Sequence, residues 1–367
     1  MKDKILILGG YGNFGKLISK SLARSNIDII IAGRNIEKAT KQKDHIINSH
    51  PNSNVEISIF DAEKEIDLQL AILSPKVVIN TCGPFQETDY KIAESCIKHK
   101  IHYIDLSDGR DYVTGITELN TAAKHNNVQI VSGASTVPAL SSAVLEHFKD
   151  DFSEIDSMKF GITPGAKAPR GLATTKAILG YTGRKLKPCI GQSKNRYGWQ
   201  DMYKQNYPEI GNRWMANCDI PDLDLLPEKY GIKNIKFSAG MESKLLHFLI
   251  WLISWMVRIG LPIKLEKYSS FFLRVSKLFD FLGTDAGGMH VIIKGKGKND
   301  NDLETKWFII AKSGDGPNIP TIPSIILAKK LINNNYYESG AIPCVAMISL
   351  NEYINELNEF DVETYTL

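Results

Sequence analysis

Short apolar runs alternate with amphipathic segments over the first 150 residues of the chain. Six runs have the length and composition of buried strands: residues 5–8, 27–32, 55–59, 77–80, 103–105 and 128–132. The segments between them have helical spacing, notably residues 16–25, 88–98 and 111–126. Alternating strands and helices predict an α/β fold, with a Rossmann-type doubly wound parallel sheet over residues 1–150.

The pattern becomes less regular after about residue 152. Strand-like runs at 288–294 and 307–310 flank a polar stretch, which predicts a β-hairpin. Further expected elements are a strand at 158–163, a helix at 325–333 and a late strand at 344–350. We therefore predict a second, mixed α+β domain over residues 151–340 for substrate binding and dimerisation. Residues 341–367 form a C-terminal segment, for which packing back onto the first domain is one interpretation.

Residues 245–257 are apolar nearly all round and end at Arg258. The run is shorter than the ~20 residues needed to span a bilayer, so we predict a helix that does not cross one. Burial in a core or a dimer seam is the first interpretation, with Phe248, Leu252 and Trp255 packed against the sheet or a second subunit. Two tryptophans and basic flanks leave a second interpretation open, in which residues 245–263 make peripheral membrane or lipid contact.

The composition limits the function classes. The chain has 367 residues, 43% of them hydrophobic, and a net charge of +3, which does not suggest a nucleic-acid surface. Its five cysteines are scattered without a CxxC pair, which favours reduced thiols over a disulfide framework or a zinc site. We expect a cytoplasmic protein without a signal peptide, without a metal and with a homodimeric assembly.

A glycine-rich turn follows the first predicted strand directly. Such a turn, placed between a strand and a helix, lets a pyrophosphate approach the backbone and sit on free N–H groups at the helix N-terminus. We therefore predict a dinucleotide site formed by Gly10, Tyr11, Gly12, Asn13, Phe14 and Gly15.

Arg34 stands at the end of the second predicted strand, where an NAD site usually carries an acid. No acid occupies positions 32–35. A guanidinium in this place suits a 2′-phosphate, so the sequence favours NADP(H) over NAD(H). A solvated surface arginine is the alternative.

Unusual residues also follow the other predicted strands, at the edge of the sheet where ligands bind. We expect Asp61 to meet the adenine, and the remaining cofactor contacts to come from Cys82, Gly83, Pro84, Phe85 and Ser135. The candidate catalytic residues are Cys82, Tyr90 and Asp108. Each has a structural alternative: a small buried thiol for Cys82, packing for Tyr90, and capping of the next helix for Asp108.

The first 150 residues resemble the saccharopine dehydrogenase (reductase)-like oxidoreductases. The matching pieces are residues 9–15, 32–34, 80–85 and 102–106. The resemblance implies a nicotinamide dinucleotide in the first domain and a mixed second domain. It does not imply the substrate, because residues 133–138 lack the acid that saccharopine reductases carry in this turn.

We therefore expect an NADP(H)-dependent oxidoreductase that transfers a hydride to a small or lipid-like carbonyl, imine or enoyl substrate. The alternative is a non-catalytic dinucleotide-binding module that senses or scaffolds. A short-chain dehydrogenase is disfavoured, because no Tyr-x-x-x-Lys stands at a suitable place.

Overall fold

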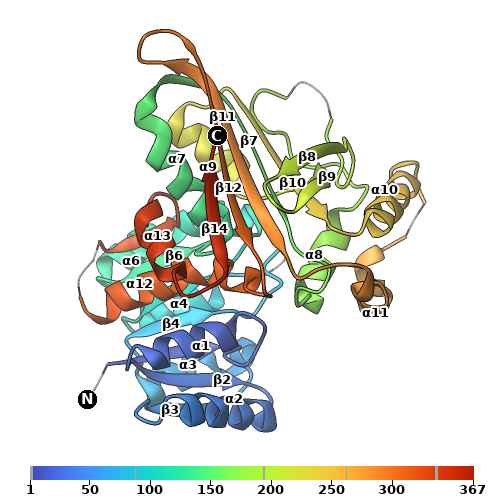
Figure 1. Cartoon of the computed structure of the whole chain (residues 1–367). Helices are drawn as coiled ribbons and strands as arrows, with labels where there is room; N and C mark the ends of the chain where they lie inside the picture. The colour runs from blue at the N-terminus through green and yellow to red at the C-terminus, as the bar shows by residue number, and fades with distance from the viewer. Residues whose placement is uncertain (1–2, 87, 193–194, 262, 335–337) are drawn as a thin grey trace. The chain divides into compact units, whose positions relative to one another are not determined.

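The computed structural model describes residues 3–86, 88–192, 195–261, 263–334 and 338–367. Two compact units divide the chain: the first contains residues 1–140 and 318–348, and the second contains residues 141–317 and 349–367. The first unit thus takes a late segment of the chain in addition to its N-terminal part. In Figure 1, α12 (Ile322–Ile332) has the orange-red colour of the chain end but lies among the blue and cyan elements.

The first unit contains a parallel sheet of seven strands in the order β13-β6-β5-β4-β1-β2-β3. This confirms the predicted Rossmann-type fold class. The strands are β1 (Lys4–Leu8), β2 (Asp28–Gly33), β3 (Val55–Ile59), β4 (Val77–Asn80), β5 (His102–Asp105), β6 (Gln129–Ser132) and β13 (Gly340–Pro343).

Helices pack against both faces of this sheet. Successive side chains of a strand point to opposite faces, and here both sets are apolar. Leu6 and Leu8 of β1 belong to a core cluster with α3 and α4, whereas Ile5 and Ile7 point to the opposite face, and all four are buried. The helices of the unit are α1 (Gly15–Arg24), α2 (Ile36–Ser49), α3 (Ala62–Leu73), α4 (Lys91–Lys98), α5 (Arg110–Gly115), α6 (Asn120–His125) and α12, with short 3-10 turns at Ile116–Leu119 and Gly316–Thr321.

The second unit contains a mixed sheet of seven strands in the order β14-β12-β11-β7-β10-β9-β8. Its β7 and β10 are parallel, and the predicted hairpin is present as β11 and β12. The strands are β7 (Phe152–Thr163), β8 (Tyr203–Tyr207), β9 (Gly211–Asn217), β10 (Asn234–Met241), β11 (Gly287–Gly297), β12 (Asp302–Ala311) and β14 (Val362–Thr366). The helices are α7 (Ser141–Phe148), α8 (Leu172–Tyr181), α9 (Asp222–Tyr230), α10 (Lys244–Arg258), α11 (Ser269–Lys277) and α13 (Leu350–Leu357).

The structure corrects the late strand expected at residues 344–350. The last strand of the first unit is β13, four residues earlier, where it pairs with β6. Cys344 donates one more backbone hydrogen bond to Ser132, and a positive φ of 59° at Ala346 then turns the chain. Ser349 caps α13, so the apolar residues of this stretch serve a turn and a helix start.

The helix expected at residues 111–126 is also different. It is divided into α5, a 3-10 turn and α6. The break lies at Gly115, where a Cβ would be 2.5 Å from the hydroxyl of Tyr90.

The apolar segment 245–257 forms the predicted helix, α10, but the three side chains expected to pack against the sheet are exposed in this chain, and packing against a second subunit stays a prediction. Phe248, Leu252 and Trp255 are 39%, 53% and 39% exposed. The buried residues of α10 are His247, Ile250 and Ser254. Among the described residues, no helix has both the length and the hydropathy to cross a membrane.

Candidate functional site

The glycine-rich turn is held from both sides by hydrogen bonds at the carboxyl edge of the first sheet. The N–H groups of Gly9 and Gly10 donate to the carbonyl of Ala32, at 2.9 and 3.3 Å. From the other side, the hydroxyl of Thr81 donates to the carbonyl of Leu8 at 2.8 Å. These bonds fix the conformation of the turn.

The start of α1 is open to an anion. Its N-cap residue, Phe14, makes no side-chain capping bond, and the first turn contains no acid. Among the residues described, the backbone N–H groups of Tyr11, Asn13 and Phe14 have no backbone acceptor. A helix N-terminus with free N–H groups and no acid favours a bound phosphate.

Gly15 is required by packing. A Cβ at this position would lie 2.1 Å from the carbonyl oxygen of Gly9. The helix can approach the turn this closely only because residue 15 has no side chain. In a dinucleotide-binding motif the third glycine has this role, because it allows close packing of the helix.

Tyr11 connects the glycine-rich turn to the end of β2. A Cβ on Gly33 would lie 2.4 Å from the Tyr11 hydroxyl, so the tyrosine ring lies directly against that glycine. The same hydroxyl accepts a hydrogen bond from the N–H of Asn35 at 2.9 Å. Asn35 in turn caps α2 by accepting from Lys38. Tyr11 thereby sets the path of the backbone on both sides of Arg34.

Arg34 is exposed beside this junction. Within the described part of the chain, its side chain makes no hydrogen bond and no ion pair with another residue. A free guanidinium next to an open helix N-terminus offers a second anion contact at the same edge of the sheet.

The loop after β4 lies against the glycine-rich turn. Asn80 accepts the N–H of Cys82 at 3.0 Å, and a Cβ on Gly9 would lie 3.0 Å from the Cys82 sulfur. The Cys82 side chain reaches the surface, but the protein atoms around it desolvate the thiolate and raise the pKa of the thiol to about 11. The thiol is therefore protonated at neutral pH.

Phe85 and Tyr90 have packing roles. Phe85 is buried against Tyr112, with ring centroids 5.4 Å apart. The Tyr90 hydroxyl donates to the carbonyl of Tyr112 at 2.7 Å, and burial raises its pKa to about 12. These contacts agree with the packing interpretation of Tyr90.

Asp105, at the end of β5, ties two neighbouring loops together. Its Oδ1 accepts the N–H of Ser107, the N–H of Gly133 and the hydroxyl of Ser132, each at 2.9 Å. Its Oδ2 is buried without a hydrogen-bond partner among the described residues, and burial raises the pKa of the carboxyl to about 6. From the sequence, the candidate roles of Asp105 are orienting a substrate or capping the next helix; the signal for the buried role is an acid at the end of an otherwise apolar strand.

The remaining predicted residues lie in loops at the same edge. Asp61 caps α3 by accepting the N–H of Glu63, and Asp108 accepts from the side chain of Gln86 at 3.0 Å. The capping alternative for Asp108 is wrong, because the N-cap of α5 is Gly109. Ser135 follows β6, and its N–H donates to the carbonyl of Gly133.

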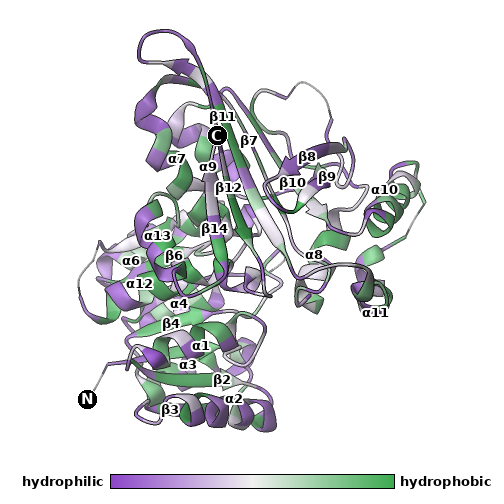
Figure 2. Cartoon of the chain, in the orientation of Figure 1, coloured by the Kyte–Doolittle hydropathy of each residue, from purple (hydrophilic) through white to green (hydrophobic). Residues whose placement is uncertain are grey.

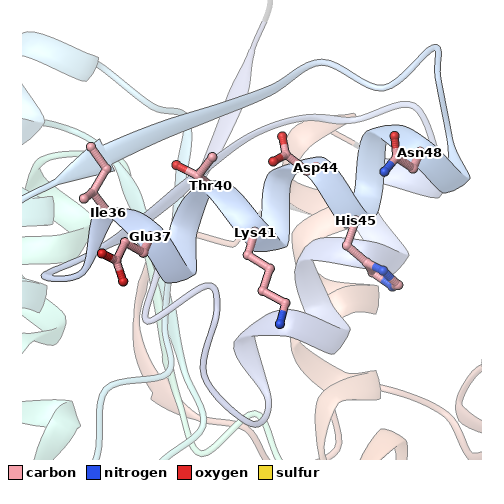
Figure 3. Close-up of a pocket in the computed structure, with 7 residues that line it drawn as sticks. All are labelled: Ile36, Glu37, Thr40, Lys41, Asp44, His45 and Asn48. Carbon is pink, nitrogen blue, oxygen red and sulfur yellow. The ribbon is translucent and has the colours of Figure 1, made fainter.

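A separate hollow lies along α2. It is lined by side chains of that helix alone, labelled in Figure 3: Ile36, Glu37, Thr40, Lys41, Asp44, His45 and Asn48. No residue of the glycine-rich turn or of the loops after β4, β5 and β6 lines it, so it is not part of this site. Within the described ranges, no group of three or more His, Cys, Asp or Glu side chains is arranged to hold a metal.

Comparison with known proteins agrees with this geometry. Residues 5–146 match the family model described as the saccharopine dehydrogenase NADP binding domain. The match lies within the N-terminal part of the chain and covers less than half of its length. The saccharopine dehydrogenase-type domain confirms both the predicted resemblance and the prediction of NADP as the cofactor.

Two similar proteins extend the comparison. Eugenol synthase 1 of Petunia hybrida is 33% identical over 97 residues, which is 26% of this chain and 32% of that protein. The chain thus matches about a third of the length of this curated relative. Apo saccharopine dehydrogenase (L-Glu forming) from Saccharomyces cerevisiae has a similar structure, with a TM-score of 0.66 over 100% of both chains at 11% identity. At this identity the likeness shows a shared fold, including the mixed second domain.

Proposed function

We propose that this chain is an NADP(H)-dependent oxidoreductase that transfers a hydride to a small or lipid-like carbonyl, imine or enoyl substrate. The observation that carries the proposal is the uncapped N-terminus of α1, with no acid in its first turn, and the unpaired Arg34 beside it. NADP(H) supplies the hydride when bound, and the protein binds and orients it.

Each side chain at this edge has a defined task in the proposal. The N–H groups of the glycine-rich turn hold the pyrophosphate, and Arg34 holds the 2′-phosphate. Tyr11 and Asn35 fix the backbone that carries Arg34. The loop after β4 borders the glycine-rich turn through Cys82, and in the proposal this loop, with Cys82 and Phe85, lines the nicotinamide side. Asp61 toward the adenine and Ser135 toward the cofactor remain predictions.

Titration calorimetry with NADPH and NADH tests the cofactor assignment. A charged hydrogen bond contributes about 1.5–3 kcal/mol, so Arg34→Ala should weaken NADPH about ten- to a hundredfold and leave NADH unchanged. Arg24→Ala is the matched control, because it removes the same charge at the opposite end of α1. Equal loss in both variants, or equal affinity of the wild type for both dinucleotides, would contradict the role of Arg34.

A binding module without turnover is the second candidate. It is favoured by the state of two proposed catalytic groups, since the Cys82 thiol is protonated at neutral pH and the Tyr90 hydroxyl is bonded to a backbone carbonyl. NADPH oxidation, followed by its near-ultraviolet absorbance, separates the two. The substrates to test are α-keto acids with lysine, aldehydes and enoyl thioesters. Turnover with any of them supports the enzyme, whereas NADPH binding without oxidation across the panel supports the module.

A further inference from the structure

Helix α10 is oriented with its apolar face outward. The side chains that it buries include the polar residues His247 and Ser254, with Ile250 between them. The outward stripe recurs at helical spacing and is large and apolar: Leu245, Phe248, Leu249, Leu252, Trp255, Met256 and Ile259. Figure 2 shows the green colour of hydrophobic residues along this helix. An amphipathic helix on the surface of a water-soluble protein has the reverse arrangement, with its apolar face toward the core.

The stripe continues on the segment that follows. Leu261, Tyr268, Phe271, Leu278 and Phe281 are exposed, with Phe281 at 75%. Both α10 and α11 pack on one core cluster around Trp199 and Leu265, so their exposed side chains belong to one region of the second unit. Twelve of the nineteen exposed large hydrophobic side chains of the described chain lie between residues 245 and 281. We call these twelve the apolar surface.

Positive charge surrounds the apolar surface. Residues 244–282 contain six basic side chains and two acidic ones, whereas the whole chain has a net charge of only +3. All six are exposed and make no ion pair with a described carboxylate: Lys244, Arg258, Lys264, Lys267, Arg274 and Lys277. The guanidinium carbon of Arg258 lies 4.7 Å from the centroid of the Trp255 ring.

We propose that the apolar surface binds the anionic headgroup region of a lipid bilayer, with α10 lying in the plane of the interface. Exposed aromatic and aliphatic side chains enter the boundary between headgroups and acyl chains, while lysine and arginine contact the lipid phosphates. Trp255 and Tyr268 are of the types that prefer this depth. The helix has 15 residues, a length of about 22 Å at ~1.5 Å per residue, which is short of the ~30 Å hydrocarbon core.

Charge distinguishes a membrane from a second copy of the chain. In a two-fold dimer the same patch meets itself, so the unpaired basic side chains would face one another. An anionic bilayer instead neutralises them. The charge therefore favours lipid as the occupant of the apolar surface.

Vesicle flotation with the full chain tests the proposal. Wild type should float with phosphatidylcholine vesicles that contain phosphatidylserine, and less with phosphatidylcholine alone or at high salt. Leu252→Glu should weaken this binding at least about tenfold, because it places a charge in the apolar stripe. The double variant Lys264→Glu/Lys267→Glu should weaken binding to anionic vesicles selectively. Tryptophan emission should shift to the blue on binding.

A matched control places the same charge on another exposed apolar residue. Ile72 on α3 is 65% exposed, against 53% for Leu252, so Ile72→Glu should bind vesicles like wild type. An unchanged circular dichroism spectrum and an unchanged urea-unfolding midpoint show that each variant is folded. The proposal is overturned if the wild type binds neither kind of vesicle, or if Ile72→Glu loses as much vesicle binding as Leu252→Glu. It is also overturned if Leu252→Glu dissociates a dimer in light scattering without changing vesicle binding.

Discussion

Asp105 shows how a single buried side chain organises the edge of the sheet. One carboxylate oxygen receives three donors, from the loop after β5, from the last residue of β6 and from the residue that follows it, and the other has no hydrogen-bond partner within the described residues. Nearby, the Tyr103 hydroxyl accepts from Asn80 at 3.1 Å, and Asn80 also holds Cys82. These buried groups position three loops at once, so we regard Asp105 as a positioning residue and not as a catalytic one.

The raised pKa of Asp105 makes stability depend on pH. The folded protein holds this proton up to a pKa of about 6, against 3.8 for an ordinary aspartate. Proton binding by Asp105 therefore contributes fully to the free energy of unfolding below about pH 4, and this contribution is lost as the pH rises through 6. Asp105→Asn should increase the free energy of unfolding at pH 8 by up to about 3 kcal/mol, with no gain at pH 4. Urea unfolding of both proteins across this range measures it, and parallel curves would contradict the assignment.

Tyr90 provides a second test at this scale. Tyr90→Phe removes the hydrogen bond to the Tyr112 carbonyl but keeps the ring contact, whose centroids are 4.8 Å apart. A neutral hydrogen bond of this kind contributes about 0.5–1.5 kcal/mol. The variant should be less stable by that amount and should bind NADPH normally. Loss of turnover at unchanged stability would instead make the hydroxyl catalytic.

At the scale of elements, α10 carries a polar group on its inward face. His247 is buried, neither ring nitrogen has a hydrogen-bond partner among the described residues, and its ring packs edge-on against Trp199 at 5.4 Å. Burial lowers the pKa of His247 to about 4. The inward face of α10 is thus suboptimal for stability, while its outward face is suited to lipid.

His247→Leu should therefore stabilise the protein by about 1–3 kcal/mol, the penalty of an unsatisfied buried polar group. The gain should increase as the pH falls from 7 to 5, because the unfolded histidine takes up a proton that the folded one does not. His45→Leu, at an exposed site on α2, should give no such gain in the same unfolding experiment. Equal changes in both variants would refute the argument, and vesicle binding should be unaffected by either.

At the scale of the whole molecule, the first unit is completed by residues that follow the second. Helix α12 buries most of its length, including Ile322, Ile325 and Leu327, and contacts β1, β4 and β5. Strand β13 pairs with β6 at the edge of the sheet. A fragment that ends near residue 150 lacks both elements and exposes the strands that they cover.

A fragment of residues 1–150 should consequently bind a hydrophobic dye, aggregate and bind NADPH poorly. Joining residues 318–348 to residue 140 through a flexible glycine-serine linker should restore a monodisperse protein that binds NADPH. Light scattering and calorimetry measure both properties. A well-folded fragment 1–150 with full NADPH affinity would contradict this view of the unit.

Local patterns were sufficient for the strands and for the cofactor. All six strands predicted in the first 150 residues are present within one residue at each end, because strands buried on both faces are continuous apolar runs. The glycine-rich turn and Arg34 could be recognised from the sequence, because backbone sterics and charge restrict which residue types can stand at these positions. These features, and with them the NADP-binding domain, were determined by the sequence itself.

Long-range packing decided the rest. The pairing of β13 with β6 joins residues some two hundred positions apart, which no local pattern encodes. Residues 245–257 are apolar nearly all round, so their sequence could not tell which face of α10 turns inward. The bonds of Asp105 depend on a neighbouring strand being at hydrogen-bond distance. Tertiary structure alone decided these three features, because each depends on which distant residues the fold brings into contact.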